Sequence, residues 1–143
     1  MTDWVVVNYL RPLFREDTTQ LLKDHLAQSD LVVLVSSGPT PLLARIGAEW
    51  GVEHVVGTVP AKKDGRFTGG VAGRVCIDET KASFARDYLS ARGFKVDYAA
   101  SYAYGDSTSD LGLLEMAGNP VAVYPDKGLK PIAAARGWRV FPG

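Results

Sequence analysis

Two aspartates four residues apart form the most informative group of reactive side chains in the sequence. They occur in the segment Gly105–Asp110 (GDSTSD), where a strand-like stretch gives way to a helical pattern. Asp106 is expected at the strand tip and Asp110 in the first helical turn, with Gly105 allowing a turn free of side-chain clashes. Such carboxylates suit a hard cation such as Mg²⁺, for which one or two usually suffice. Both acids would also be favoured simply as helix-start residues, so the segment alone leaves two interpretations open.

A second group of residues has the character of an anion site. Ser36, Ser37 and Gly38 follow the apolar run Leu31–Val35 and precede a helical pattern, with Ser37 or Thr40 as its predicted cap. A hydroxyl, backbone amides and a helix N-terminus pointing the same way suit a phosphate group. A capping serine in an ordinary loop is the alternative.

Lys81 is a third candidate, because its charge opposes the local electrostatics. If Asp78 caps the helix predicted over residues 78–92, Lys81 lies in its first turn, where the helix dipole disfavours a cation. A positive charge in that place suggests a negative ligand. The alternative is a solvated lysine beside Asp78 or Glu79.

The elements that must position these residues alternate between short β-branched runs and longer amphipathic stretches. This pattern predicts a doubly wound, mainly parallel Rossmann-like α/β sheet flanked by helices. Its ligand site should lie at the carboxyl ends of the strands, which brings Ser36, Lys81 and the Asp106/Asp110 pair to one edge as a phosphate and Mg²⁺ site. The predicted strands are 31–35, 54–58, 98–104, 120–124 and 138–141, and a small β-hairpin occupies residues 60–73. Of the last two predicted helices, the first ends at Gly118 and the second spans residues 127–136.

Composition narrows the function classes. The 143 residues are 46% hydrophobic, and 16 basic residues balance 16 acidic ones. Zero net charge argues against broad attraction to nucleic acid or to an anionic membrane. One cysteine excludes an intrachain disulfide framework, and no apolar run approaches the roughly 20 residues that span a bilayer. We therefore expect residues 1–143 to form a single cytoplasmic domain that acts on a small molecule.

Four segments, taken in order, resemble the haloacid dehalogenase (HAD) superfamily, and within it the phosphoserine-phosphatase-like branch (subfamily IB). They are Leu34–Ser37, Asp64–Gly69, Glu79–Lys81 and Tyr104–Asp110. The resemblance implies a HAD-type core that hydrolyses phosphate esters with Mg²⁺ through an aspartyl-phosphate, a covalent route that divides one difficult step into two.

The same resemblance implies a role for each candidate residue. Ser36 would bind the transferring phosphoryl group, and Ser37 and Gly38 would contribute to the phosphate site. Lys81 would hold that group and the nucleophile in place. Asp106 would ligate Mg²⁺, and Asp110 would support the metal site.

The sequence departs from the family at the nucleophile. The family's Asp-x-Asp-x-Thr stretch, which ends its central strand, is absent, and the nearest match, Asp17-Thr18-Thr19, lies at a helix start. Residues 1–10 are then either a remnant of the family's cap or a replacement central strand with Asn8 at the nucleophile's position. Alignment favours the tail of a cap helix over Trp4–Leu10, and we favour it as ancestry, whereas β-propensity favours the strand. In either case we expect the folded chain to fill the vacant strand position, and this segment is one candidate to do so.

We therefore predict a Mg²⁺-dependent phosphatase core that is truncated or catalytically incomplete, with little or no activity by itself. Its partner would be a small phosphorylated molecule, and we expect it to bind neither nucleic acid nor a membrane. The alternatives are a non-catalytic module for phosphate-ligand binding or assembly, and one half of a split phosphatase completed by another chain or in a homo-oligomer.

Overall fold

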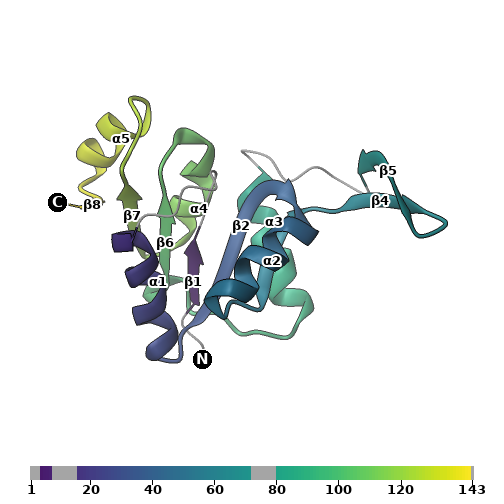
Figure 1. Ribbon diagram of the computed structural model, residues 1–143. Coiled ribbons are helices and arrows are strands. Elements are labelled where there is room, and N and C mark those ends of the chain that lie inside the picture. The colour runs from purple at the N-terminus through teal and green to yellow at the C-terminus, as the bar shows by residue number, and fades with distance from the viewer. Residues whose placement is uncertain (1–3, 8–15, 72–79, 143) are drawn as a thin grey trace.

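A six-stranded parallel sheet forms the centre of the protein (Figure 1). The computed structural model describes residues 4–7, 16–71 and 80–142. The strand order is β3-β2-β1-β6-β7-β8, so β1 and β6 lie in the middle and β3 and β8 at the edges. The strands are β1 (Trp4–Val7), β2 (Leu31–Pro39), β3 (His54–Thr58), β6 (Tyr102–Gly105), β7 (Asn119–Val123) and β8 (Arg139–Phe141).

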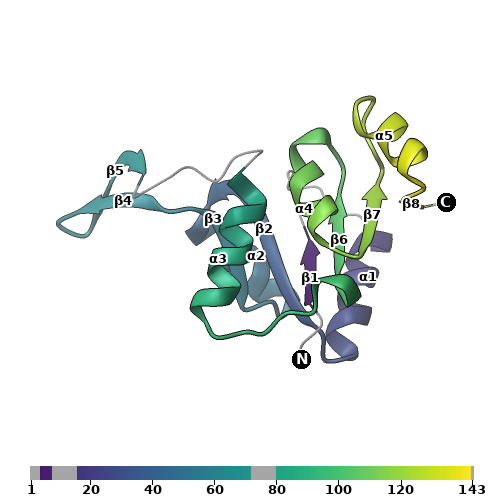
Figure 2. The same ribbon diagram turned by 180° about the vertical axis from the view of Figure 1, so that it is seen from behind.

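Helices cover both faces of this sheet, as the two opposite views show (Figures 1 and 2). They are α1 (Glu16–Ala27), α2 (Thr40–Trp50), α3 (Lys81–Ala91), α4 (Leu111–Met116) and α5 (Leu129–Arg136). One apolar cluster joins α1 and α2 to the sheet, and a second joins α3, α4 and α5 to its other face. The predicted doubly wound α/β fold is thus confirmed. Among the described helices, none is long and apolar enough to cross a membrane.

Strand β2 shows why the apolar run was a reliable signal. Val32 and Leu34 belong to the cluster under α1 and α2, whereas Val33 and Val35 belong to the cluster under α3 to α5. All four are buried, as expected for a strand covered on both faces. The strand continues beyond its predicted end at Val35 to Pro39, through a register irregularity against β3.

The N-terminal segment occupies the central strand position. Trp4–Val7 forms β1 and pairs in parallel with both β2 and β6. A helix over these four residues is therefore wrong, and they form the strand that β-propensity predicts. The backbone groups of β2 and β6 that face each other across this position need partners, and β1 supplies them. Residues 8–10, including Asn8, lie outside the described residues.

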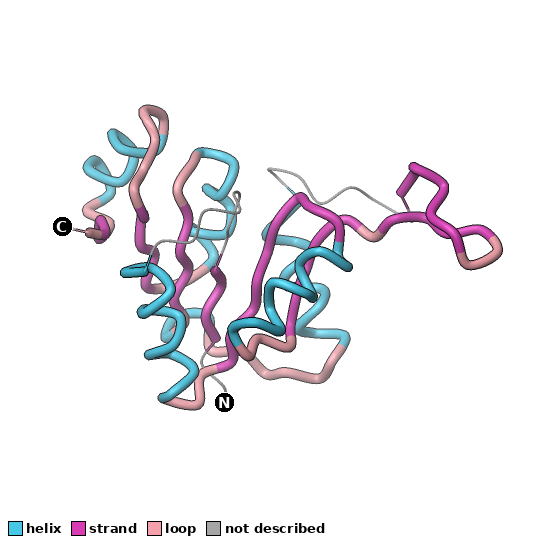
Figure 3. The backbone as a smooth tube through the Cα atoms, viewed as in Figure 1, coloured by secondary structure: helices cyan, strands magenta, loops and turns pink. Residues whose placement is uncertain are grey.

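The predicted hairpin is present and projects from the body of the protein (Figure 3). Strands β4 (Pro60–Lys63) and β5 (Arg66–Val71) pair antiparallel, with Lys63 opposite Arg66. Asp64 and Gly65 both have positive φ, 52° and 79°, as a two-residue type I′ connection requires. The hairpin's predicted last residues, 72 and 73, lie outside the described residues.

Several helix and strand boundaries in the structure differ from the predicted ones. The strand predicted over 98–104 begins only at Tyr102, because Tyr98–Ala100 forms a short 3₁₀-helix whose last amide donates to the Asp97 carboxylate at 3.3 Å. Helix α5 begins at Leu129 rather than at 127. Pro39 precedes α2 without a side-chain cap, so the predicted capping by Ser37 or Thr40 is wrong.

Candidate functional site

The two aspartates of the GDSTSD segment lie at the carboxyl end of β6. The strand ends at Gly105, Asp106 follows it, and Asp110 closes a short 3₁₀-helix, Thr108–Asp110, that leads directly into α4. The predicted strand-to-helix junction is therefore confirmed, with one turn of 3₁₀-helix between strand and α-helix. Asp110 lies in the first helical turn after the strand, as expected.

Asp110 holds the junction together from a buried position. Its side chain has no solvent exposure. Oδ1 accepts a hydrogen bond from the Lys81 ammonium at 3.1 Å, and Oδ2 accepts from the amides of Asp106 and Ser107 at 3.1 and 3.3 Å. Because both oxygens are engaged within the protein, Asp110 fixes the loop that carries Asp106.

Lys81 is the buried counter-charge of Asp110. It is the first residue of α3, so its predicted place in the first helical turn is confirmed, and it is 1% exposed. Besides Asp110, its ammonium donates to Ser109 Oγ at 3.4 Å, and that hydroxyl lies 2.7 Å from Ser107 Oγ. Since the helix start disfavours a cation, the Asp110 carboxylate is the partner that stabilises it there. Asp78, its predicted helix cap, lies outside the described residues; Thr80 precedes the helix.

Asp106 is the group in this cluster with unused binding capacity. Its Oδ1 is buried and has no hydrogen-bond partner among the residues that the structure describes. Burial, and next the charge of Asp110, raise the pKa of the Asp106 carboxyl to about 6, with a smaller contribution from Asp126. A buried carboxylate oxygen without a donor is costly unless a cation or proton meets it. The site therefore fits a hard cation such as Mg²⁺, which takes one or two protein carboxylates and completes its shell with water or substrate oxygens.

The described residues contain no cluster of three or more His, Cys, Asp or Glu side chains able to hold a metal. A cation at Asp106 would thus take few ligands from the part of the chain that the structure describes.

Replacing Asp106 with asparagine should raise the free energy of unfolding at about pH 8 by about 1 to 2 kcal/mol. The folded state raises the pKa of this carboxyl, so it favours the protonated form, and the cost of ionisation develops as pH rises from about 4 through about 6. At lower pH the carboxyl is neutral in both folded and unfolded states, and the two proteins should converge. Thermal melts with EDTA across this range measure the effect. Exposed Asp24 offers the control: an equal gain from Asp24→Asn contradicts the prediction.

Asp126 contributes to the site in a way that the sequence prediction did not assign. Its amide donates to the Asp106 carbonyl at 2.9 Å, which ties the end of β7 to the end of β6. Its Oδ1 accepts from the amides of Gly128 and Leu129, at the start of α5, at 3.1 and 2.8 Å. An aspartate just before a helical pattern is the signal that could have identified this role.

Ser36 lies near the end of β2, at the same carboxyl edge of the sheet. It is 6% exposed, and its Oγ accepts a hydrogen bond from the Gly38 amide at 3.1 Å. The Gly38 amide, predicted to be free for an anion, is therefore engaged by Ser36 itself. The Ser37 carbonyl accepts from Thr58 Oγ1 at 3.0 Å, which anchors this irregular part of β2 to β3. Bulges of this kind commonly redirect side chains beside functional sites.

The structure thus joins some of the predicted site residues by direct contacts and leaves others apart. Lys81, Asp106 and Asp110 form one hydrogen-bonded unit. Ser36 shares the sheet edge with them, and α3, which carries Lys81, packs against β2 and β3. Within the described residues, however, the hydrogen bonds of this unit do not extend to Ser36. A bound anion would have to bridge the two parts.

Comparison with known families agrees with this fold. The family model for haloacid dehalogenase-like hydrolases matches residues 3–115. The chain therefore belongs to the haloacid dehalogenase-like hydrolase family.

Named relatives include several phosphatases. A probable phosphatase of Mycobacterium tuberculosis is 34% identical over 130 residues, which cover 91% of this chain and 44% of the relative. A histidinol-phosphatase of Neisseria meningitidis serogroup C is 30% identical over 138 residues, covering 95% of this chain and 62% of the relative. A phosphoserine phosphatase of M. tuberculosis is 32% identical over 125 residues, which cover 87% of this chain and 40% of the relative. This chain thus spans between two fifths and two thirds of the length of these relatives.

Solved structures show the same fold. A protein of unknown function from Bordetella pertussis Tohama I superposes with a TM-score of 0.83 at 35% identity, covering 92% of this chain and 59% of that one. A phosphoserine phosphatase in its apo form superposes with a TM-score of 0.64 at 23% identity, covering 79% of this chain and 56% of that one. The second similarity shows the fold alone.

Proposed function

We propose that this chain provides the phosphate- and Mg²⁺-binding part of a HAD-type phosphoric-monoester hydrolase, and that by itself it binds phosphorylated ligands with little or no turnover. The observation that carries this proposal is the Lys81–Asp110 pair, which holds Asp106 at the end of β6. One buried oxygen of the Asp106 carboxylate has no hydrogen-bond partner within the described part of the chain. Relatives named as phosphatases of histidinol phosphate and phosphoserine support a small phosphorylated ligand.

In this proposal each residue of the cluster has a separate task. Asp106 Oδ1 would hold Mg²⁺, which when bound offsets the negative charge of the phosphoryl oxygens. Asp110 positions the Asp106 amide and accepts a hydrogen bond from the buried Lys81 ammonium. The Lys81 ammonium has three donor hydrogens, and Asp110 and Ser109 account for two of them in the described structure. A phosphoryl oxygen could take the third.

Ser36 would meet the phosphoryl group from the neighbouring strand end. Its hydroxyl accepts from the Gly38 amide, and its own hydrogen remains available as a donor to an anion. A phosphate that replaced Ser36 Oγ as the acceptor of the Gly38 amide would gain a second donor. Ser36, Ser37 and Gly38 would then act together, as the family resemblance implies.

The proposed lack of turnover rests on the nucleophile. Hydrolysis through a covalent intermediate requires a carboxylate that attacks phosphorus and is later released by water. The 143 residues contain no Asp-x-Asp sequence, and the residue that follows β1 in the sequence is Asn8. The neutral amide of asparagine does not replace an attacking carboxylate. We therefore propose that phosphate esters bind at this site and are not hydrolysed at an appreciable rate.

The arrangement of β1 bears on the alternative of a split phosphatase. Because β1 already pairs with β2 and β6, a complementing chain could not add its own central strand without displacing β1. This observation favours the non-catalytic binding module over the split enzyme as the second candidate function.

Two measurements on the full chain test the proposal. Incubation with p-nitrophenyl phosphate and Mg²⁺ should give turnover at or near the uncatalysed rate. Calorimetric titration with Mg²⁺, and with inorganic phosphate in its presence, should show binding that Asp106→Ala abolishes and Asp24→Ala leaves intact. Robust Mg²⁺-dependent turnover that disappears in Asp106→Ala would show that the chain is a complete enzyme. Absence of Mg²⁺ and phosphate binding would refute the proposed site.

A further inference from the structure

A pocket lies at the opposite end of the sheet from Asp106. It has a volume of about 650 Å³ and opens where β6, β7 and β8 begin, whereas Asp106 follows the last residue of β6. Volumes of about 300 to 1,000 Å³ are typical of small-molecule sites. Its walls include the first residues of these strands, Tyr102, Asn119 and Arg139, and the ends of α4 and α5.

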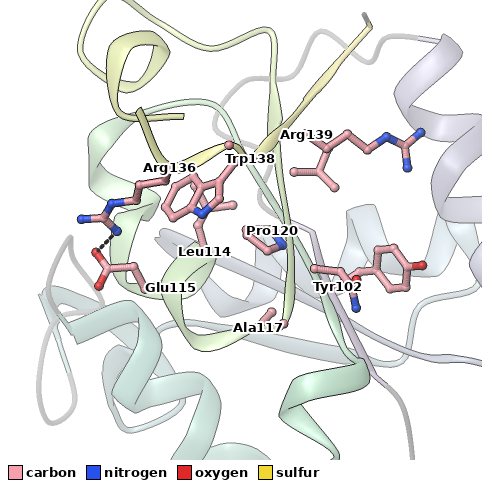
Figure 4. Close-up of a pocket in the computed structure, with 12 residues that line it drawn as sticks. Tyr102, Leu114, Glu115, Ala117, Pro120, Arg136, Trp138 and Arg139 are labelled. Atoms are coloured by element: carbon pink, nitrogen blue, oxygen red, sulfur yellow. Dashed lines mark ion pairs between the residues drawn. The ribbon is translucent and has the colours of Figure 1, made fainter. Parts of the chain in front are cut away.

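The shape of the pocket follows from unequal strand lengths. Strand β8 first pairs with β7 at Val121, opposite Arg139. The two preceding residues of β7, Asn119 and Pro120, therefore have β6 on one side and no β8 partner on the other. Pro120 has no amide hydrogen, so this part of the edge does not require a full set of β-sheet partners. The notch places the Pro120 ring at the middle of the pocket (Figure 4).

One side of the pocket carries an aromatic ring, Trp138, against which an ion-paired arginine stacks. Arg136 forms an ion pair with Glu115 at 3.0 Å, and its guanidinium lies 5.1 Å from the centre of the Trp138 ring. Figure 4 shows Trp138 between Arg136 and Pro120. Arginine stacks readily on aromatic faces, so the Glu115 carboxylate and the indole together restrain this guanidinium. The indole and Pro120 then offer apolar surface to a planar group.

The other side of the pocket carries a positive charge that the described part of the chain does not neutralise. Arg139 points away from Trp138, toward the side where Tyr102 lies (Figure 4). No ion pair or hydrogen bond joins its guanidinium to any described residue. Two guanidiniums and one carboxylate line the pocket, which leaves one net positive charge. A guanidinium is well matched to a carboxylate through paired hydrogen bonds.

We propose that this pocket binds a small planar carboxylate, with its ring against Trp138 and Pro120 and its carboxylate on Arg139. The ligand carries one negative charge, which matches the single net positive charge of the lining. The site is separate from the phosphate site and does not depend on the proposed function, because no residue of the Ser36, Lys81, Asp106 or Asp110 group lines it.

The aromatic carboxylate 2-naphthoate is a suitable probe, titrated into the full ¹⁵N-labelled chain and followed by NMR. We expect the indole N–H signal of Trp138 and the guanidinium signal of Arg139 to shift together, with a dissociation constant of about 0.1 to 1 mM. Neutral 2-naphthamide should bind at least about fivefold more weakly than 2-naphthoate, because it lacks the charge that Arg139 recognises. Shifts confined to residues near Asp106 would overturn the proposal, as would the absence of any shift at about 5 mM probe.

Two substitutions and a matched control complete the test. Arg139→Gln should weaken 2-naphthoate binding about fivefold or more and leave 2-naphthamide unchanged. Trp138→Leu should weaken both probes. Arg86→Gln is the control, because it removes the same guanidinium group from a residue that lies outside the pocket. Equal losses from Arg139→Gln and Arg86→Gln, or no loss from either, would show that the pocket does not select a carboxylate.

Discussion

Replacing Lys81 with methionine lowers the free energy of unfolding by about 3 to 5 kcal/mol, which is the usual cost of leaving one partner of a buried ion pair alone. Lys81 and Asp110 are almost completely inaccessible, and their charged atoms lie 3.1 Å apart. Methionine keeps much of the aliphatic stem and removes the charge. The Asp110 carboxylate is then buried without its counter-charge, although the amides of Asp106 and Ser107 still donate to it. Urea denaturation at neutral pH measures the loss.

Two further variants separate a charge effect from a packing effect. Lys81→Met combined with Asp110→Asn should recover a large part of the lost stability, since replacing both members of a buried pair is often close to neutral. Glu115→Gln is the exposed counterpart, because its pair with Arg136 has nearly the same length, 3.0 Å, but both side chains are about half exposed. We expect it to cost less than about 1 kcal/mol. A loss of similar size from Lys81→Met and Glu115→Gln would contradict the prediction.

The buried pair also shows which part of the site could be predicted from the sequence. The motif order placed Lys81 at a helix start and Asp106 and Asp110 at a strand end, and both placements are confirmed. The direct contact between Lys81 and Asp110, 29 residues apart, could not be predicted. It depends on how α3 packs against α4, and no local pattern records that packing. For the same reason, the sequence suggested a phosphate as the partner of Lys81, whereas the nearest anion is an internal carboxylate.

Elements with strong local signals were predicted well. Leu31–Val35 is apolar on both faces and forms a strand buried on both faces, and the Asp64-Gly65 turn forms the hairpin. Boundaries were less accurate where a side chain competes with the strand ladder. At residues 98–100 the Asp97 carboxylate accepts a hydrogen bond from a backbone amide and stabilises a 3₁₀ turn. The strand therefore begins only at Tyr102. Such local capping by aspartate competes with sheet formation.

The N-terminal segment illustrates a conflict between ancestry and physical preference. Alignment to the family favours the end of a cap over Trp4–Leu10, whereas the β-branched residues in Trp4–Val7 favour a strand. The sheet decides between them for these four residues, because β2 and β6 need a strand between them and β1 pairs with both. Local propensity and the unmet backbone hydrogen bonds of the neighbouring strands act in the same direction here. Family alignment does not include either of these physical terms.

Replacing Gly105 with alanine should destabilise the protein by about 1 to 3 kcal/mol and abolish Mg²⁺ binding. A Cβ atom at this position would lie 2.6 Å from Asp110 Cβ, 3.0 Å from its Oδ2 and 3.1 Å from its Cγ. Asp110 cannot move aside easily, because three hydrogen bonds hold its carboxylate. The substitution therefore pushes Asp110 away from Lys81, from the Asp106 amide, or from both. Urea denaturation and calorimetric titration with Mg²⁺ measure the two effects.

Gly112→Ala is the matched control, with the opposite expected sign. Gly112 lies in α4, and a Cβ there would approach Ala82 Cβ at 3.5 Å, an ordinary contact. Since alanine is favoured over glycine within a helix, this variant should gain about 0.5 to 1 kcal/mol and keep its Mg²⁺ binding. Equal tolerance of both substitutions would mean that Asp110 is not fixed by its three bonds. Loss of stability in Gly105→Ala with Mg²⁺ binding retained would mean that Asp106 holds its position without Asp110, so the glycine is required by the buried pair and not by the metal site.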